Sequence, residues 1–482
     1  MIASRKFQLT LAGLAVFGLQ IWQLGRPSMW ADEVATVAAS TRPLHSLLRM
    51  MQFIDAVHGT YYILIHFLGK LIGYGPFALR LPSAIAVTAA VLLTFVLARK
   101  LFGERLAWFA LVVAAFLPRL TWAATEARSY GIVAFLGVAL TLIFVLALTS
   151  ETDRTAKRYW VTYTATLILA IHFFVYLALL AGSQGVWLLL VRRKGFLRWL
   201  TAVGISIVVS AYILVWVIME KGQVGWLPPL GKDTLNEIFI GQAFWSNPQL
   251  ALLANGLILA VLAGASHRGK AVPAEEIRVM WLLGLGVVVP PLVILAASIR
   301  GGSIYDSRYF TFAAPLVAIL LALALERLFS RRLAYLALAV VVALAVPSYF
   351  DFRALNAKGT YWGQIAAQVR IHSKPGDAIL FTDYARKSPS LSRISIAYPA
   401  DFANTTDLTV VTPYRQAIGL YPKRMPVPSA VSAIGARSRV LVLEQNTELV
   451  EYRAIAGLLK AKGFHQSQRY RAYDAWLRVF TR

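Results

Sequence analysis

The stretch WVTYTATLILAIHFFVYLALLAGSQGVWLLLV, residues 160–191, decides how this chain is laid out. Its 32 residues include no Asp, Glu, Lys or Arg. The stretch is too long for one membrane span of about 20 residues and short for two. We predict two short spans, 160–172 and 174–191, which meet near His172-Phe173-Phe174, because short helices are tolerated where they line a cavity inside a protein.

The basic residues on either side of this stretch favour two spans over one. With two spans, every basic cluster between spans falls on the same face, whereas one span would move the last three clusters to the other face. The clusters are Arg5/Lys6, Arg99/Lys100/Arg105, Arg154/Lys157/Arg158, Arg192/Arg193/Lys194/Arg198, Arg268/Lys270/Arg278 and Arg327/Arg331/Arg332. Positive loops mark the cytoplasmic face, so we expect a multi-pass protein of the plasma (inner) membrane with a cytoplasmic N-terminus.

Composition predicts the same class of protein. Hydrophobic residues make up 58% of the chain and charged residues only 15%, whereas soluble domains average about 25% charged residues. The absence of cysteine excludes disulfides and cysteine-based metal sites. We predict about eleven spans, at 7–24, 77–98, 106–123, 129–149, 160–172, 174–191, 197–217, 249–265, 279–298, 309–326 and 333–349.

The polar parts of the chain divide it into two predicted domains. Residues 1–349 form the transmembrane domain, whose first outer loop, 26–76, includes an interfacial helix at 63–71. Residues 350–482 alternate strand-length and helical patterns, so we expect a soluble α/β domain outside the membrane. This domain has 19 Lys and Arg against nine Asp and Glu, which suits anionic lipid or an acidic glycan, or reflects solvation alone.

Acidic side chains come directly after the first span. Asp32 and Glu33 lie at the edge of the low-dielectric layer, where the pKa of a carboxyl group rises. A carboxylate held in such a place can act as a general base. The alternative is that Asp32 caps the helix expected at 34–40, with Glu33 favoured by the helix dipole.

Carboxylates and arginines recur at the other outer span ends. Glu126 and Arg128 lie between two spans, and Asp306 and Arg308 lie before a later one. Arg80 begins the second span, either as an anchor at the interface or as a phosphate ligand. We expect these acids and arginines to lie at one depth in the membrane, at its outer surface. Such a layout suits a reaction between a lipid phosphate ester and an acceptor on the water side.

Five short elements, in order over about residues 1–320, resemble the GT-C superfamily of polyprenyl-phosphate-sugar glycosyltransferases. The resemblance is to the branch of the protein O-mannosyltransferases and the aminoarabinose transferase. The elements are Asp32-Glu33, Asp55…His58…Tyr61-Tyr62…His66, Leu79-Arg80-Leu81-Pro82-Ser83, Glu126-Ala127-Arg128-Ser129-Tyr130 and Ser307-Arg308-Tyr309. One departure is His58-Gly59-Thr60, where many relatives have His-Pro-Pro.

The resemblance implies a GT-C fold and roles for particular residues. Asp32 would act as the base, with Glu33 beside it, and Glu126 would be a second acid near the acceptor or the sugar. The donor phosphate would be held by Arg128, Arg308, Tyr309 and Arg80. Substrate binding would involve His58, Asp55, Tyr61 and His172, although a lone His172 between two spans also fits a structural hydrogen bond.

The predicted function is therefore transfer of a sugar from a polyprenyl-phosphate donor with inversion at the anomeric carbon. Mannose is the sugar that we expect. The acceptor is a glycan, lipid or protein of the cell envelope, on the outer face, and no nucleic acid is expected as a partner. The alternative is a flippase or transporter of a lipid-linked sugar, which would need a hydrophilic path through the membrane. Some relatives use a divalent metal, but no His/Asp cluster at ligand spacing is present, so we expect no required cofactor.

Overall fold

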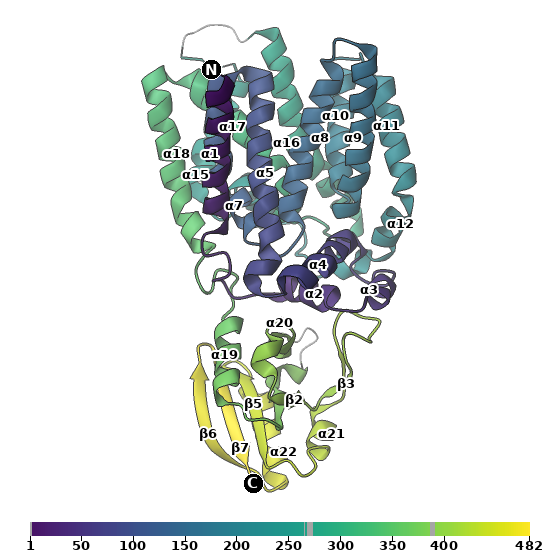
Figure 1. Ribbon diagram of the computed structural model, residues 1–482, viewed down its shortest axis with the longest axis vertical. Coiled ribbons are helices and arrows are strands. Elements are labelled where there is room, and N and C mark those ends of the chain that lie inside the picture. Colours follow the sequence, from purple (N-terminus) through teal and green to yellow (C-terminus); the bar gives the residue numbers. More distant parts are fainter. Residues whose placement is uncertain (1, 265, 268–272, 386–390) are drawn as a thin grey trace. The chain divides into compact units, whose positions relative to one another are not determined.

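The computed structural model describes residues 2–264, 266–267, 273–385 and 391–482 (Figure 1). By their contacts, these residues form two compact units. Of the described residues, those in the ranges 2–24, 55–61 and 80–353 form the first unit, and those in the ranges 25–54, 62–79 and 354–482 form the second. Arg268 and Lys270, which belong to one predicted basic cluster, lie outside the described residues.

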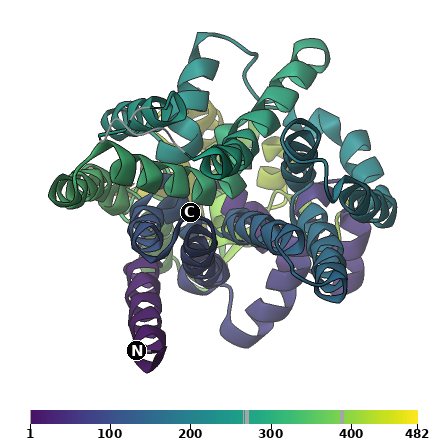
Figure 2. The ribbon, with the colours of Figure 1, turned by 90° about the horizontal axis from the view of Figure 1, so that it is seen from above.

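The first unit is a bundle of long helices, seen along their axes in Figure 2. Its helices are α1 (Ile2–Ile21), α5 (Pro76–Phe102), α6 (Glu104–Phe116), α7 (Pro118–Ala124), α8 (Tyr130–Leu148), α9 (Asp153–Phe173), α10 (Leu177–Leu190), α11 (Phe196–Val209), α12 (Ala211–Met219), α15 (Pro248–Leu262), α16 (Ala274–Gly301), α17 (Ala314–Leu328) and α18 (Arg331–Asp351). The 3₁₀ turn η4 (Ser307–Ala313) leads into α17.

Length and composition make this a multi-pass membrane protein. Within the described residues, five helices are long and apolar enough to cross a membrane, and up to eight if each bent pair counts as one span. A helix occupies every one of the eleven predicted spans. Three of these helices fall outside that count: α1 and α10 are shorter apolar helices, and α9 is not among the candidate spans. The fold class is therefore confirmed, while the number eleven stays a prediction.

The long apolar stretch at 160–191 divides where we expected. Helix α9 ends at Phe173, Phe174 is extended with φ −166° and ψ 115°, and α10 starts at Leu177. Helix α9 begins earlier than predicted, at Asp153, because the hydroxyl of Thr152 accepts a hydrogen bond from the Thr155 amide and caps it. Helix α9 therefore begins with polar turns that precede the apolar span, and a hydropathy pattern does not identify these turns.

Two predicted spans contain bends that were not predicted, and a third bend precedes the predicted span 249–265. Helices α6 and α7 meet at 56°, because Pro118 excludes the helical conformation at Leu117, where ψ is 122°. The α11–α12 pair bends by 59° at Ser210. The third pair joins α15 to a segment built of α13 (Lys232–Asn236), the π-helix η3 (Glu237–Gly241) and α14 (Gln242–Phe244), at 86°.

Helices α8 and α17 form the centre of the bundle. In the stretch Ser307–Leu328, formed by η4 and α17, 89% of the apolar window is buried, against 28% in the peripheral α18. A Cβ atom at Gly137 in α8 would lie 2.7 Å from the carbonyl oxygen of Phe312, and one at Gly131 would lie 2.7 Å from that of Ser83 in α5. Glycine at these two positions therefore lets α8 approach its neighbours closely.

A buried arginine forms hydrogen bonds with backbone carbonyls at the end of helix α1. Arg353 donates hydrogen bonds to the carbonyl oxygens of Trp22 and Tyr349, each at 3.0 Å, and of Leu19 at 3.2 Å. Its guanidinium lies 3.7 Å from the ring centroid of Tyr349. Burial lowers the pKa of Arg353 to about 10, so the group stays charged at neutral pH and satisfies carbonyls that a helix end leaves open.

In the second unit, the predicted first outer loop forms helices. They are α2 (Ala31–Ser40), α3 (Leu44–Met50) and α4 (Gly59–Ile72). Between α2 and α3, the buried Arg42 donates to the carbonyl oxygens of Ala417 at 2.7 Å, Gly419 at 2.6 Å and Leu420 at 2.8 Å. Burial lowers the pKa of Arg42 to about 10, which again leaves it charged.

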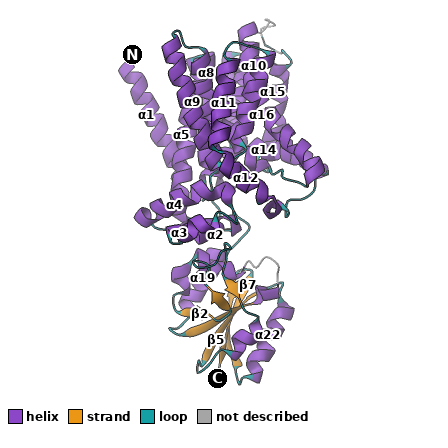
Figure 3. Ribbon diagram, turned by 90° about the vertical axis from the view of Figure 1, so that its right-hand side faces the viewer, coloured by secondary structure: helices purple, strands orange, loops and turns teal. Residues whose placement is uncertain are grey.

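The second unit also contains the described β-strands (Figure 3). The main sheet has the order β2-β1-β5-β7-β6, with β2 (Thr405–Asp407), β1 (Asp377–Phe381), β5 (Arg439–Gln445), β7 (Ala475–Thr481) and β6 (His465–Ala472). Strand β1 runs parallel to β2 and β5, whereas β7 runs antiparallel to β5 and β6. A separate pair joins β3 (Val410–Thr412) to β4 (Lys423–Arg424).

Helices complete this α/β domain, which confirms the predicted fold class. Helices α21 (Val427–Ser432) and α22 (Leu449–Ala461) contribute Val431, Ile455 and Leu459 to a core shared with Leu380 and Val442 of the sheet. Helix α19 (Trp362–His372) packs on β6 and β7. The remaining short elements are η5 (Thr382–Ala385), η6 (Leu391–Arg393), α20 (Ile394–Ala397) and η7 (Pro399–Phe402).

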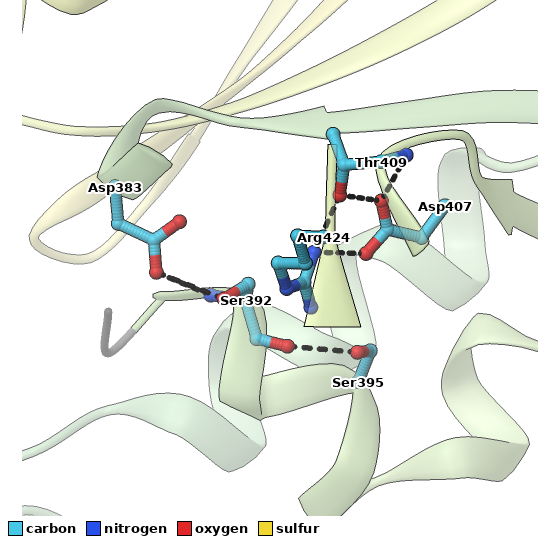
Figure 4. Close-up of polar contacts among 6 residues, drawn as sticks. All are labelled: Asp383, Ser392, Ser395, Asp407, Thr409 and Arg424. Atoms are coloured by element: carbon cyan, nitrogen blue, oxygen red, sulfur yellow. Dashed lines mark hydrogen bonds and ion pairs between the residues drawn. The ribbon is translucent and has the colours of Figure 1, made fainter. Parts of the chain in front are cut away.

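Acidic side chains at the carboxyl ends of the parallel strands form hydrogen bonds or ion pairs with residues of neighbouring segments (Figure 4). Asp383, after β1, accepts hydrogen bonds from the amide of Ser392 at 2.8 Å and from its hydroxyl at 3.0 Å. Asp407, at the end of β2, accepts from Thr409 and pairs with Arg424. Ligands of open α/β sheets bind at this edge, but here these carboxylates hold the loops in place.

We predict opposite effects for alanine at two glycines of the bundle. Gly137→Ala places a methyl group against the backbone of η4 and should destabilise the protein by about 1–3 kcal/mol. Gly182→Ala in α10 meets no atom within 4 Å and should be neutral or slightly stabilising. Melting temperatures of the two variants in detergent measure the difference. Equal melting temperatures would contradict the close approach of α8 to η4.

Candidate active site

Three segments far apart in the sequence meet around His58 in the first unit. His58 ends the turn η1 (Ala56–His58) and its ring stacks on Phe174, with centroids 6.2 Å apart and planes at 20°. Phe174 lies at the break between α9 and α10, and its ring also contacts Tyr309 of η4 at 5.4 Å. Tyr176 packs edge-on against Tyr309 at 5.6 Å and donates a hydrogen bond to the Ile304 carbonyl. The break in the long apolar stretch thus supplies the aromatic wall of this cluster.

Arg308 is held in a fixed orientation beside this wall. Its backbone amide donates to one carboxylate oxygen of Asp306 at 3.0 Å, and its Nε lies 2.9 Å from the other. The guanidinium lies 5.5 Å from the ring centroid of Trp226 and 5.7 Å from that of Tyr309. Contact with aromatic faces stabilises a guanidinium and limits its motion.

The charges around His58 favour an anion. Burial lowers the pKa of His58 well below its ordinary value, and the nearby positive charges of Arg128 and Arg308 lower it further. His58 is therefore neutral at physiological pH, while both arginines keep their charge. The arrangement is one that binds a phosphate or a carboxylate in a poorly solvated environment.

The second predicted cluster, Glu126 and Arg128, is buried at the start of α8. Glu126 is fully buried and Arg128 is 6% exposed. The backbone here is held by α5, since the hydroxyl of Ser83 donates to the carbonyl of Arg128 at 3.0 Å. Arg80, also in α5, donates to the carbonyl of Leu24 at 2.9 Å.

The predicted substrate-binding residues lie in different environments. Asp55 has a left-handed backbone with φ +62°, and its amide donates to Gln223 at 3.0 Å. Tyr61 is fully buried in α4. His172 has its Nε2 within 2.8 Å of the Tyr212 hydroxyl and its Nδ1 within 2.8 Å of the Ile168 carbonyl, contacts that suit the structural alternative.

Asp32 and Glu33 belong to the second compact unit. Helix α2 begins at Ala31 after Trp30, so both carboxylates lie in its first turn, where the helix dipole favours negative charge. Asp32 is therefore inside the helix and does not occupy the N-cap position that the alternative interpretation assigned to it. Glu33 is fully buried and Asp32 is partly exposed. The predicted meeting of Asp32 with Glu126 and Arg308 stays a prediction, because these residues belong to different units.

One charged residue of this region had no predicted role. Arg119 lies inside the predicted span 106–123, at the start of α7, and is 1% exposed. It donates to the carbonyls of Gly241 and Gln242 and to the hydroxyl of Ser307. Its guanidinium lies 4.9 and 4.8 Å from the ring centroids of Trp122 and Trp245. Arg119 thus ties the π-helix η3 to the residue that precedes Arg308.

Metal ligands do not gather in the described part of the chain. No group of three or more His, Asp or Glu side chains is found there in an arrangement that could hold a metal ion.

His58 should make the stability of the protein fall at acidic pH. Its pKa is lowered in the folded protein, whereas in the unfolded chain it takes up a proton near pH 6.5. Protons then favour the unfolded state, and wild type should lose about 1–2 kcal/mol between pH 7 and pH 5 relative to His58→Gln. Melting temperatures across this range measure the effect, with the exposed His45→Gln as the control. Parallel pH profiles for wild type and His58→Gln would contradict it.

No protein-family model matches the sequence. No curated protein sequence matches it either.

Solved structures of similar fold are found over nearly the whole chain. ArnT from Cupriavidus metallidurans bound to undecaprenyl phosphate gives a TM-score of 0.61 at 14% identity, covering 99% of this chain and 98% of that one. The arabinofuranosyltransferase AftD from Mycobacteria gives 0.52 at 17% identity, covering 99% of this chain and 41% of that one. The oligosaccharyltransferase of Archaeoglobus fulgidus in its apo form gives 0.50 at 12% identity, covering 93% and 70%. The resemblance predicted from the motifs is thus confirmed for the fold, which is that of the GT-C glycosyltransferases.

Proposed function

We propose that this protein is an inverting membrane glycosyltransferase that takes its sugar from a polyprenyl-phosphate donor. The observation that carries the proposal is the buried cluster in which a neutral His58 lies near the charged Arg128 and Arg308. The fold supports it, because ArnT of similar fold was solved with undecaprenyl phosphate bound. Mannose is the sugar to test first, and the acceptor is a glycan, lipid or protein of the cell envelope.

The proposed reaction needs an anion site and a base. A hydroxyl of the acceptor attacks the anomeric carbon of the donor, and the bond from that carbon to the phosphate oxygen breaks on the opposite face. The proton of the hydroxyl passes to Asp32, and the polyprenyl phosphate leaves with both electrons of the broken bond. Arg128 and Arg308 stabilise the negative charge that gathers on the departing phosphate.

The other predicted site residues have supporting roles in this proposal. Arg80 and Tyr309 complete the phosphate side, and Glu33 and Glu126 lie on the acceptor or sugar side. We assign His58, Asp55 and Tyr61 to substrate binding. For His172 we propose the structural role instead, because its two ring nitrogens lie 2.8 Å from the Ile168 carbonyl and the Tyr212 hydroxyl. A neutral His58 can donate one hydrogen bond to a sugar or phosphate oxygen without adding charge.

The proposed location is the inner membrane, with the N-terminus in the cytoplasm and the α/β domain outside. The loops between α5 and α6, between α8 and α9, and between α10 and α11 lie at the same end of the bundle as the N-terminus (Figure 1). These loops carry basic clusters, and by the positive-inside rule this supports a cytoplasmic position for this end of the bundle. The cluster around His58 then faces the outer leaflet.

The first test uses Asp32→Asn, with the exposed Asp233→Asn as a matched control. Purified proteins in liposomes receive a radiolabelled polyprenyl-phosphate sugar and a crude envelope acceptor. Loss of a general base should lower transfer by about 10²- to 10⁴-fold in Asp32→Asn, while Asp233→Asn should match wild type. Equal transfer by all three proteins contradicts the role of Asp32. Movement of the lipid across the bilayer without transfer supports a flippase instead.

The second test concerns the phosphate side. Arg308→Gln removes a charge-assisted hydrogen bond and should weaken donor binding by about 10- to 100-fold. The exposed Arg300→Gln changes the net charge equally and should bind the donor as wild type does. Titration with a polyprenyl-phosphate sugar measures both affinities. An unchanged affinity in Arg308→Gln would remove this residue from the donor site.

A further inference from the structure

A cavity of about 650 Å³ lies at the basic end of the bundle. It is lined by the turn that joins α8 to α9, the first turns of α9, the last turn of α10 and the start of α11. Helix α8 runs from Tyr130, beside the proposed active site, to Leu148, beside this cavity. Nineteen helical residues span about 28 Å, so the cavity is separate from the proposed active site.

One side of the cavity is cationic. Arg193, Lys194 and Arg198 line it together with the carboxylates Glu151 and Asp153. Asp153 is engaged by Arg198 and by Lys157, the latter at 3.1 Å. Arg193 and Lys194 are exposed, and within the described chain neither forms an ion pair. Their charges are therefore available to an anion from outside the protein.

The other side of the cavity is apolar and continues onto the surface of the helices. Trp160 and Ala147 form its buried wall. On the rim, the side chains of Leu189 and Leu197 are 51% and 75% exposed, and Leu190 next to them is 75% exposed. Exposed leucines on membrane helices face lipid, so cations and hydrocarbon-facing side chains meet at this rim.

We propose that this cavity binds the phosphodiester headgroup of an anionic phospholipid. Basic pockets between membrane helices on the cytoplasmic side suit such headgroups. The phosphate lies against Arg193 and Lys194, and the acyl chains extend along Leu190 and Leu197. The proposal is independent of the sugar-transfer reaction, because it uses none of the residues assigned to that site.

A free phosphate or a soluble phosphate ester shares the charge that this site recognises. The lipid is the better match because the exposed leucines lie on the rim of the same cavity and offer nothing to a soluble anion. The volume also exceeds what an inorganic phosphate fills, since pockets of about 300–1,000 Å³ hold ligands of drug size.

The test compares two double variants that remove the same charge. Arg193→Gln/Lys194→Gln changes the cavity, whereas Arg154→Gln/Arg158→Gln changes exposed cations of α9 that do not line it. Each full-length protein in neutral detergent is titrated with phosphatidylglycerol or phosphatidylcholine, and bound lipid is counted by native mass spectrometry. Size-exclusion profiles check that both variants are folded.

We expect wild type and the α9 variant to bind phosphatidylglycerol in preference to phosphatidylcholine. The cavity variant should bind phosphatidylglycerol about tenfold more weakly. Equal binding by the two double variants, or no preference for the anionic lipid, overturns the proposal. Competition with glycerol phosphate and inorganic phosphate separates the sources: displacement of the lipid at equal concentration overturns the lipid assignment, and its absence supports it.

Discussion

Hydrogen bonds from buried arginines to backbone carbonyls are the interaction on which this structure depends. Four of its largest fully buried side chains are Arg42, Arg80, Arg119 and Arg353, and each donates to main-chain carbonyls at a helix end, a bend or a loop. A helix end leaves carbonyls without partners, and neither lipid nor a protein interior supplies water to satisfy them. A guanidinium has several hydrogen-bond donors and stays charged, so one side chain can form hydrogen bonds with several of these carbonyls at once. Broken helices are thereby tolerated within an apolar protein.

Broken helices in turn create the cluster around His58. If residues 160–191 formed one unbroken helix, the chain would not reverse direction near Phe174. Phe174 and Tyr176 would then lie along the side of that helix and would not contact Tyr309. The 86° bend before α15 depends on the segment 237–245, which Arg119 holds to Ser307. Arg308 follows directly, so the position of a proposed phosphate ligand depends on a structural arginine about 190 residues earlier in the chain.

The sequence predicted the positions of the long helices better than the site, for a physical reason. Hydropathy and loop charge act locally, so the helices at the predicted spans and the break after Phe173 could be found without coordinates. The bend at Leu117 could have been foreseen from Pro118, whereas the bend at Ser210 has no proline signal. Phe174 and Tyr176 look like ordinary apolar residues in a span, and only the fold brings them to Tyr309. Arg119 was missed because one cation does not lower the mean hydropathy of a long apolar stretch enough to be noticed. A cation inside a predicted span is nevertheless a sign of function or of a helix break.

The charge balance around His58 bears on how the proposed reaction would be accelerated. A polyprenyl-phosphate sugar is a phosphodiester with one negative charge, and the departing polyprenyl phosphate gains a second. In the proposed site, Arg128 and Arg308 would attract the departing phosphate more strongly than the bound donor, which is the condition for lowering a barrier, although Asp306 beside Arg308 offsets part of this positive charge. If His58 were protonated, a third cation would strengthen binding of the donor as well and would hold the product. In the proposed reaction, the burial that keeps His58 neutral would therefore favour release of the carrier after transfer.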